Sequence, residues 1–397
     1  MCYVWVSKNL TVDEQVQLLL MRIENYPTEE KQSLGHSLND MMLRCSFDSD
    51  ACYPAHFKIN TYKNSGNCFT LGDKTAEPSL SWPVTQAGPA NGLIIELDIE
   101  QDEYLPMTES AGIKVLLHSG SEIVFPDNSG ILAAPGFVTS IGIRKSESYL
   151  LPAPYGNCIS QSSDTNSIKN LYEELGYTYT KDACMRTCLQ KEIFKSCGCI
   201  ESDVVNIINV LNYKDWLDLD QTKSIQICDE LSERCIYKTV LQFQKGQLGC
   251  DELCPSACEQ IVYHTTVSNS LWPSSAYIDT YIHFVNQTPT IRNKAYNWTA
   301  YPQAHVRNNF LRLEIYYETL NFEVSTSSPT FDWNSLLGNI GGQLGLWLGF
   351  SVLTAVEIVQ LTMQVCVHVI HLQYDKYRKA RTCRDTEIAP PPGSTYV

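Results

Sequence analysis

Four short segments in which hydrophobic and polar residues alternate predict a β-sheet. The alternation is clearest in residues 93–100 and 311–318, and residues 113–118 and 137–144 also have the composition of strands bounded by turn residues. Because these segments lie far apart along the chain, we expect a sheet that joins distant parts of the sequence.

A spacing typical of helices occurs between the strands. Residues 12–24 and 34–43 show it near the N-terminus, and residues 168–176 and 181–194 show it again in the middle of the chain. The second pair belongs to a segment, residues 158–258, that contains ten cysteines. We expect this segment to be a helical insertion held together by disulfides.

One long apolar stretch, residues 336–372, lies near the C-terminus and contains a single charge, Glu357. A helix needs about 20 residues to cross the hydrocarbon core of a bilayer, so the stretch predicts a membrane span with residues left over. Basic residues follow it at positions 376–384, and by the positive-inside rule they place the C-terminus in the cytoplasm. Residues 1–8 lack the apolar core of a signal peptide.

The composition indicates in which compartment the chain folds. The chain has 397 residues and a formal net charge of −15, which argues against a nucleic-acid partner because phosphate backbones are bound by basic surfaces. It has 16 cysteines but no CxxC pair, so disulfides outside the cell are favoured over a metal cluster, and we expect neither metal nor cofactor. Asn9, Asn286 and Asn297 stand in sequons for N-glycosylation.

The spacing of the cysteines predicts particular pairs. Cys184 and Cys188 are four residues apart and share one face of a helix, and the same spacing recurs in residues 250–258. If the two helices are antiparallel, the numbers of paired residues have a constant sum, and the remaining cysteines nest around or inside this ladder. The pairs predicted in this way are Cys184–Cys254, Cys188–Cys250, Cys158–Cys258, Cys197–Cys235 and Cys199–Cys228. Spacing alone leaves other connectivities open.

The apolar stretch also carries a family resemblance. Its segment 336–358, LLGNIGGQLGLWLGFSVLTAVEI, resembles the second transmembrane helix of the degenerin, epithelial sodium channel and acid-sensing channel family. The resemblance runs from about residue 41 to residue 372. Shorter segments that resemble the same family are residues 66–70, 102–106, 111–115, 134–137, 152–158 and 317–323.

The resemblance implies a homotrimeric or heterotrimeric, sodium-selective cation channel of the plasma membrane, blocked by amiloride and gated or modulated through its extracellular domain. The implied fold is an α+β membrane protein. A disulfide-rich extracellular domain, with a β palm, a β-ball and a helical finger and thumb, precedes one C-terminal transmembrane helix. The expected parts are a finger-like helical part (1–66), palm and β-ball strands (67–157), a disulfide-stapled thumb (158–258), knuckle and palm strands (259–330), the second transmembrane helix with its filter (331–372) and a cytoplasmic tail (373–397).

The same resemblance assigns roles within the apolar stretch. Gly349, Phe350 and Ser351 match the Gly-x-Ser selectivity filter, Gly345 matches a position linked to amiloride block, and Asn339 stands where acid-sensing relatives have an acidic residue. In an oligomer, backbone carbonyls and the serine hydroxyl would form rings that replace the hydration shell of a cation.

The residues themselves agree with a pore. Glu357 is ionisable, and ionisable groups inside membranes usually face water or the interior of a bundle. Small residues recur every three or four positions and form one helix face, for which ordinary close packing is the alternative interpretation. These residues are Gly338, Gly341, Gly342, Gly345 and Gly349.

Acidic residues on the predicted strands are candidates for gating. Glu314 and Glu318 share one strand face, as do Glu96, Asp98 and Glu100, and neighbouring carboxylates raise one another's pKa, which suits a sensor of protons or calcium. A solvated strand face is the alternative and the commoner case.

The resemblance adds three gating candidates and one disulfide. Leu320 and Asn321 match a linker between palm strands that rearranges during desensitisation, and Tyr155 matches an aromatic residue at the base of the thumb. Cys45–Cys52 would close a short finger loop. The usual partner of Cys68 belongs to a region that this sequence does not contain, and Cys2 is a weak substitute.

The sequence departs from the family by lacking the first transmembrane helix and its cytoplasmic His-Gly motif. We expect a truncated product in preference to a regulatory fragment. The alternative function is therefore a non-conducting single-pass receptor or a dominant-negative subunit. The sequence contains no HExxH, GxSxG or phosphate-binding motif, so we do not expect an enzyme. The last three residues, 395–397, fit a ligand of PDZ domains.

Overall fold

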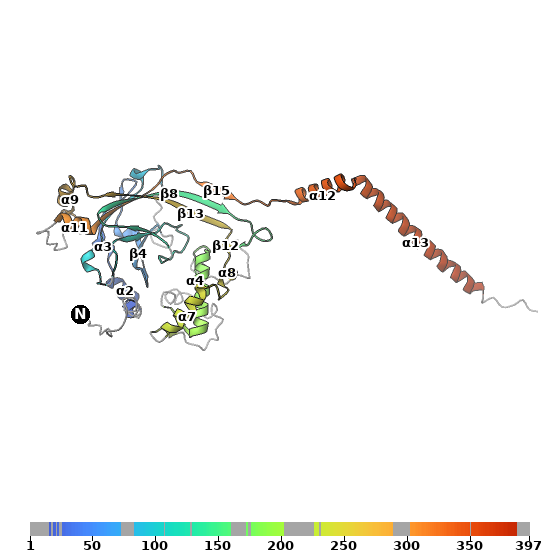
Figure 1. The fold of residues 1–397 in the computed structure, drawn as a ribbon, viewed down its shortest axis with the longest axis horizontal. Helices are drawn as coiled ribbons and strands as arrows, with labels where there is room; N and C mark the ends of the chain where they lie inside the picture. Colours follow the sequence, from blue (N-terminus) through green and yellow to red (C-terminus); the bar gives the residue numbers. More distant parts are fainter. Residues whose placement is uncertain are drawn as a thin grey trace, which may run out of the picture. The chain divides into compact units, whose positions relative to one another are not determined.

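A computed structural model of the chain describes residues 16–386, apart from residues 17–18, 21, 24–25, 73–82, 107, 128, 160–171, 174–175, 202–225, 230–231, 289–301 and 350. The chain divides into two compact units, Met1–Ser327 and Ser328–Val397. Figure 1 shows the mixed sheet and helices of the first unit and the two helices of the second. Most of the helices predicted over residues 12–24 and 168–176 lie outside the described residues.

The first unit is built on a seven-stranded sheet of order β13-β8-β14-β5-β1-β2, with β15 also pairing with β8 (Figure 1). The long strands β8 and β13 are antiparallel over 13 residues each, and β14 runs parallel to β8 and antiparallel to β5. The strands are β1 Met42–Phe47, β2 Asp50–Ala51, β5 Leu93–Asp98, β8 Phe137–Tyr149, β13 Glu259–Leu271, β14 Phe310–Tyr317 and β15 Glu323–Thr326. The expectation of a sheet made from distant segments is confirmed.

Short elements surround this sheet. Two hairpins pair β3 with β4 and β6 with β7, and the strand predicted over residues 113–118 is the short β6 of the second hairpin. The elements are α2 Thr28–Leu34, α3 Leu38–Met41, η1 Pro54–His56, β3 Phe57–Tyr62, β4 Gly66–Leu71, η2 Pro89–Asn91, η3 Gln101–Glu103, β6 Ile113–Val115 and β7 Ile131–Ala133.

The prediction of a helix over residues 34–43 is wrong, because only Leu34 and the short segment Leu38–Met41 are helical. Helix α2 ends at Leu34, α3 has only four residues with Ser37 as its cap, and β1 begins at Met42. The backbone of residues 42–47 pairs with β5 instead of forming helical hydrogen bonds. Tertiary pairing therefore overrides the local helical spacing.

Strand β5 is buried on both faces, which corrects the prediction of a half-buried strand. Ile95 and Leu97 pack into one hydrophobic cluster together with Leu311. Glu96 and Asp98, on the other face, are only 2% and 0% exposed. That face lies beside a second cluster contributed largely by α9 Ile278–Val285 and α11 Pro302–Asn309, so the acidic side chains are in the interior and not in solvent.

The cysteine-rich segment contains helices joined by disulfides, as the spacing indicated. Helix α4 begins after the capping residue Thr180 and ends before Gly198, and it packs against α7 and α8. The elements are β9 Cys158–Ile159, α4 Lys181–Cys197, β10 Cys199–Ile200, β11 Gln226–Ile227, α7 Glu233–Gln244, α8 Cys250–Leu253 and β12 Ser256–Ala257. Among the described residues the six disulfides coincide with the predicted pairs: Cys45–Cys52, Cys158–Cys258, Cys184–Cys254, Cys188–Cys250, Cys197–Cys235 and Cys199–Cys228.

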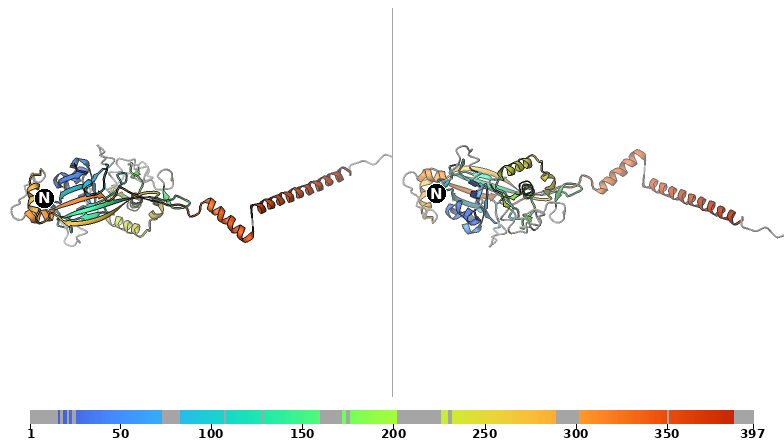
Figure 2. Two further views of the ribbon diagram at one scale, coloured as in Figure 1. Left: turned by 90° about the horizontal axis from the view of Figure 1, so that it is seen from above. Right: turned by 90° about the horizontal axis from the view of Figure 1, so that it is seen from below.

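The second unit differs from the single continuous helix expected for residues 336–372. Over its described residues it contains two helices, α12 Trp333–Leu348 and α13 Val352–Thr386, with a break between them (Figure 2). One helix among the described residues is long and apolar enough to cross a membrane, and it is Val352–Lys379 within α13. The mixed α/β region with six disulfides, followed by one such helix, agrees with the expected fold class.

Candidate pore segment

The break between α12 and α13 falls on the residues predicted to form the filter. Gly349 ends α12 in the left-handed conformation, with φ of 60°, and its backbone N–H donates to the carbonyl of Leu344. This conformation is readily accessible to glycine but is strained for residues with a Cβ atom, so the glycine fits the position at which the helix stops. Phe350 lies outside the described residues.

Ser351 caps the start of α13. Its Oγ accepts a hydrogen bond from the backbone N–H of Thr354 at 3.3 Å and lies 3.1 Å from the Thr354 hydroxyl. Its carbonyl accepts from the N–H of Ala355. Either hydroxyl of the Ser351–Thr354 pair can be the donor, and because a serine hydroxyl has two lone pairs, one acceptor position remains when Ser351 donates to Thr354.

Two helix ends with opposite partial charge therefore meet at the break. The last carbonyls of α12 have no partner within that helix and form its negative end, whereas the first N–H groups of α13 form a positive end that the Ser351 side chain partly satisfies. A dehydrated cation is attracted by the carbonyl end.

The other pore candidates are exposed in the single chain. Gly345 and Asn339 lie on α12, and Glu357 lies less than two turns into α13. A Cβ atom placed on Gly338, Gly341 or Gly342 would meet nothing within 4 Å. The small-residue face is thus unoccupied by the described part of this chain, as expected if it packs against other chains.

Glu96 lies in a polar network inside the first unit. The Tyr281 hydroxyl donates to its carboxylate at 3.1 Å, and Arg312 lies 3.5 Å from the other carboxylate oxygen. Arg312 also pairs with Glu314 at 3.0 Å, and the Ser140 hydroxyl donates to Glu314 at 3.0 Å. Burial raises the pKa of Glu96 in spite of these partners.

The acidic residues do not form the carboxylate clusters predicted from the strand faces. Glu314 shares the network described above, whereas Glu318 lies beyond the end of β14 and pairs with Arg144 at 2.8 Å. Glu100 also lies beyond its strand and pairs with His36 at 2.8 Å. Each of these three carboxylates therefore has a basic neighbour, although Glu314 shares Arg312 with Glu96.

Three of the four remaining gating candidates lie in connecting segments. Leu320 and Asn321 are in the link between β14 and β15, where the Thr319 hydroxyl accepts from the Asn321 N–H. Tyr155 is exposed in the loop between β8 and β9. Asp98 differs from these residues, because it lies at the end of β5, two residues after Glu96, where it is buried and accepts from the backbone N–H of Glu100.

Comparison with known proteins decides the family. A family model described as "Amiloride-sensitive sodium channel" matches residues 7–361. The chain is therefore a member of the amiloride-sensitive sodium channel family. It is 29% identical to the epithelial sodium channel subunit alpha of Xenopus laevis over 372 residues, which cover 91% of this chain and 54% of that protein.

Two Caenorhabditis elegans proteins give similar matches to this family member. The degenerin-like protein asic-1 is 31% identical over 91% of this chain and 40% of its own length, and degenerin unc-8 is 30% identical over 88% and 42%. The chain thus spans about half, or less, of the length of the curated relatives it matches. The description of the family is that of a channel and not of an enzyme.

Two residues of the buried network around Glu96 were not among the predicted site residues. Arg312 alternates with Glu314 on the polar face of the predicted strand, so its spacing was a usable signal. Tyr281 gave no signal, because nothing local shows that α9 covers β5. Of the three predicted glycosylation sites, Asn286 is exposed at the end of α9, and Asn9 and Asn297 lie outside the described residues.

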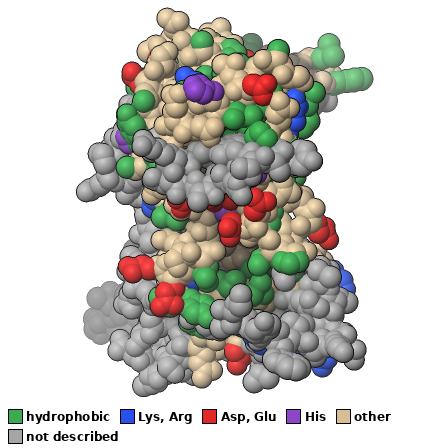
Figure 3. Space-filling view, turned by 90° about the vertical axis from the view of Figure 1, so that its left-hand side faces the viewer, with side chains coloured by type: hydrophobic (Ala, Val, Ile, Leu, Met, Phe, Trp, Pro, Cys, Tyr) green, Lys and Arg blue, Asp and Glu red, His purple; other side chains and the backbone are tan. Residues whose placement is uncertain are grey.

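Acidic side chains are spread over the face of the molecule shown in Figure 3, and its described residues form no continuous basic surface there. This agrees with the formal net charge of −15.

Proposed function

We propose that the chain is a subunit of a plasma-membrane channel that conducts sodium ions through an assembly of three subunits. The observation that carries the proposal is the break between α12 and α13, which lies at Gly349–Ser351 in a chain of the amiloride-sensitive sodium channel family. Association with other subunits of the family follows from the same membership.

The break supplies the groups that a cation needs when it loses water. The carbonyl end of α12 is negative, Gly349 has no side chain to block close approach, and Ser351 keeps one acceptor position on its hydroxyl when it donates to Thr354. Three copies would surround the ion with rings of such oxygens. The glycine face of α12 allows the helices to approach closely enough to form the rings.

Amiloride block and gating belong to the same proposal. Gly345 lies one turn before the break, so a blocker bound there would stand at the entrance to the filter. The gating signal would pass from the first unit through Leu320 and Asn321 to β15, which pairs with β8 and leads along the chain to α12. The bulk of the chain would be extracellular and the C-terminus cytoplasmic.

The test is two-electrode recording from oocytes that express the full chain, alone and together with a second subunit of the family. We expect a sodium current that amiloride reduces and that disappears when sodium is replaced by a large organic cation. Surface biotinylation reports whether the chain reaches the membrane. A chain that reaches the surface but carries no current in either setting, or that suppresses the current of its partner, would overturn the proposal in favour of a non-conducting subunit.

A further inference from the structure

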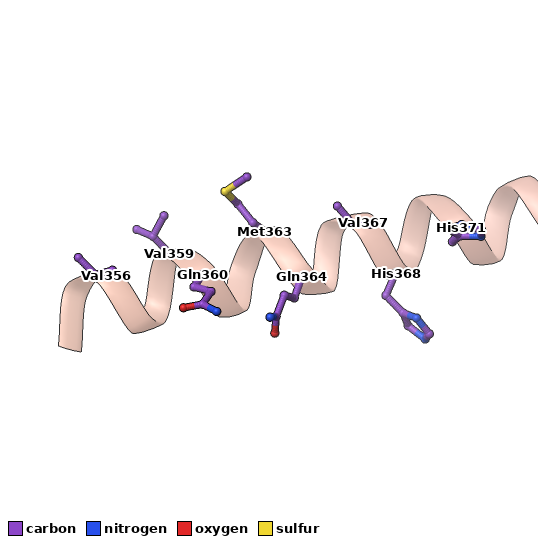
Figure 4. Close-up of a pocket in the computed structure, with 8 residues that line it drawn as sticks. All are labelled: Val356, Val359, Gln360, Met363, Gln364, Val367, His368 and His371. Atoms are coloured by element: carbon purple, nitrogen blue, oxygen red, sulfur yellow. The ribbon is translucent and has the colours of Figure 1, made fainter. Parts of the chain in front are cut away.

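Helix α13 carries a polar stripe that the conduction path proposed above does not use. Its members are Gln360, Gln364, His368, His371 and Asp375. They are spaced three or four residues apart, so they share one face of the helix, and all are exposed in the single chain. Figure 4 shows Gln360, Gln364 and His368 projecting from the same side of α13.

The stripe lies inside Val352–Lys379, the helix that is long and apolar enough to cross a membrane. Apolar side chains lie on both sides of the stripe and suit contact with lipid. On one side are Val356, Val359, Met363 and Val367, which Figure 4 shows projecting away from Gln360 and Gln364, and on the other are Leu361, Val365 and Leu372. Polar and ionisable side chains within a span face the interior of a helix assembly or a water-filled path, so the stripe faces neighbouring subunits or the path between them.

The chemistry of the stripe selects a class of ligand. His368 and His371 are one helical turn apart, a separation that places their Cβ atoms about 5–6 Å from each other, so both rings can reach one ion. Imidazole nitrogen suits zinc, copper and nickel, whereas magnesium and calcium prefer oxygen ligands. Asp375 lies one turn beyond His371 and adds a carboxylate of the kind that also binds zinc.

One chain supplies too few of these groups. Within the residues that the structure describes, no three His, Cys, Asp or Glu side chains gather closely enough to hold a metal ion. Zinc usually takes four ligands in tetrahedral geometry, and two histidines from each of two neighbouring helices would supply four imidazoles. The number of ligands is therefore complete only between copies of α13.

We propose that His368 and His371 from neighbouring α13 helices together bind a divalent transition-metal ion of the zinc class, and that the bound ion closes the conduction path. This inference rests on the proposed function, because that function places copies of α13 around one path. His368 follows Ser351 by 17 residues, which is about 25 Å along a helix. The metal would thus act at the end of the span opposite to the filter, from the cytoplasmic side in the proposed orientation.

Metal binding is tested on the purified full chain in detergent, isolated through a tag that contains no histidine. Titration calorimetry with zinc chloride measures affinity and stoichiometry. We expect fewer zinc ions than chains, and we expect the H368Q–H371Q variant to need at least about tenfold more zinc for half-saturation. The matched control is H264A–H283A, which removes two exposed histidines from the first unit and is expected to bind zinc like the wild type.

Channel block is tested in inside-out patches, with zinc applied to the cytoplasmic face and magnesium as the control ion. We expect zinc to reduce the wild-type current and to have at least about tenfold weaker potency on H368Q–H371Q. Equal zinc affinity for H368Q–H371Q and H264A–H283A, at equal elution from a sizing column, would overturn the inference. Zinc binding without any current would refute the channel function and leave the metal site standing, whereas current with neither zinc binding nor block refutes only the site.

Discussion

The Tyr281 hydroxyl donates a hydrogen bond of 3.1 Å to the Glu96 carboxylate, and both residues are almost completely buried. Tyr281 belongs to α9 and Glu96 to β5, which are 185 residues apart in sequence. The bond ties the helix to the centre of the sheet. Arg312 approaches the same carboxylate from β14, so three elements converge on one buried charge.

Removal of this hydroxyl by Tyr281→Phe is expected to destabilise the first unit by about 1.5–3 kcal/mol, the usual range for a hydrogen bond to a charged group. Thermal unfolding of the full chain in detergent measures the effect, and Trp272, whose ring lies 4.6 Å from that of Tyr281, is a local fluorescent reporter. Tyr277→Phe, at the exposed residue that directly precedes α9, is the matched control. Equal melting of both variants would contradict a stabilising bond to Glu96.

Stability is also expected to depend on pH through Glu96. Burial raises the pKa of this carboxyl above its ordinary value of 4.5, so below that value the group is protonated in both the folded and the unfolded chain. As pH rises above 4.5, the unfolded chain ionises first, and the stability contributed by Glu96 is lost until pH passes the folded pKa. Glu96→Gln should reduce this loss of stability, which is measured as the decrease of the melting temperature with rising pH. The same decrease in the variant and the wild type would refute the role of Glu96.

Gly142 and Glu318 give a third prediction. A Cβ atom on Gly142 would lie 2.5 Å from Oε1 and 2.6 Å from Cγ of Glu318, which pairs with Arg144. Gly142→Ala is therefore expected to displace the Glu318 side chain and to destabilise the fold by about 1–3 kcal/mol. In a Glu318→Ala background the same substitution should be nearly neutral, because the obstructing atoms are gone. Equal costs in the two backgrounds, by thermal melting, would exclude this contact as the cause.

Local sequence signals predicted the strands of the sheet and five of the disulfides because the causes of these features are local, whereas Cys45–Cys52 was implied by the family resemblance. Alternation marks β14 and the start of β8, and the spacing of Cys184 and Cys188 fixes which helix face bears sulfur. The burial of Glu96 could not be predicted in this way. It depends on α9, a helix from a distant part of the chain, which covers the face that alternation assigns to solvent.

The break in the apolar stretch shows a different limit. Average hydropathy continues without interruption from residue 336 to residue 372, so it predicts one helix. The stop is decided by Gly349, whose conformation ends α12, and by Ser351, whose side chain begins α13. Capping residues identify such a boundary, whereas hydrophobicity does not.

The disulfide ladder gives a fourth prediction. Cys184–Cys254 is fully buried and joins residues 70 positions apart, so the double variant C184S–C254S is expected to lose about 2–5 kcal/mol of stability and much of its surface expression. Cys68→Ser is the control, since Cys68 is a free thiol and burial raises its pKa to about 11, which keeps it protonated at neutral pH. Surface biotinylation and melting compare the two, and equal losses would argue against a structural role for the ladder.

Substitutions of Ser351 can distinguish its role as a helix cap from its proposed role as a ligand of the ion. Ser351→Ala removes the hydroxyl and, through the loss of the cap, is expected to destabilise the start of α13 by about 0.5–2 kcal/mol. Ser351→Gly also removes the hydroxyl but is expected to destabilise the start of the helix by only about a few tenths of a kcal/mol. Ser351→Thr keeps both. If the hydroxyl contacts the permeating ion, the Gly and Ala variants should show the same change in reversal potential between sodium and potassium solutions, and Thr should resemble the wild type. If only Ala differs, the residue acts through the helix cap, and the hydroxyl is not a ligand of the ion.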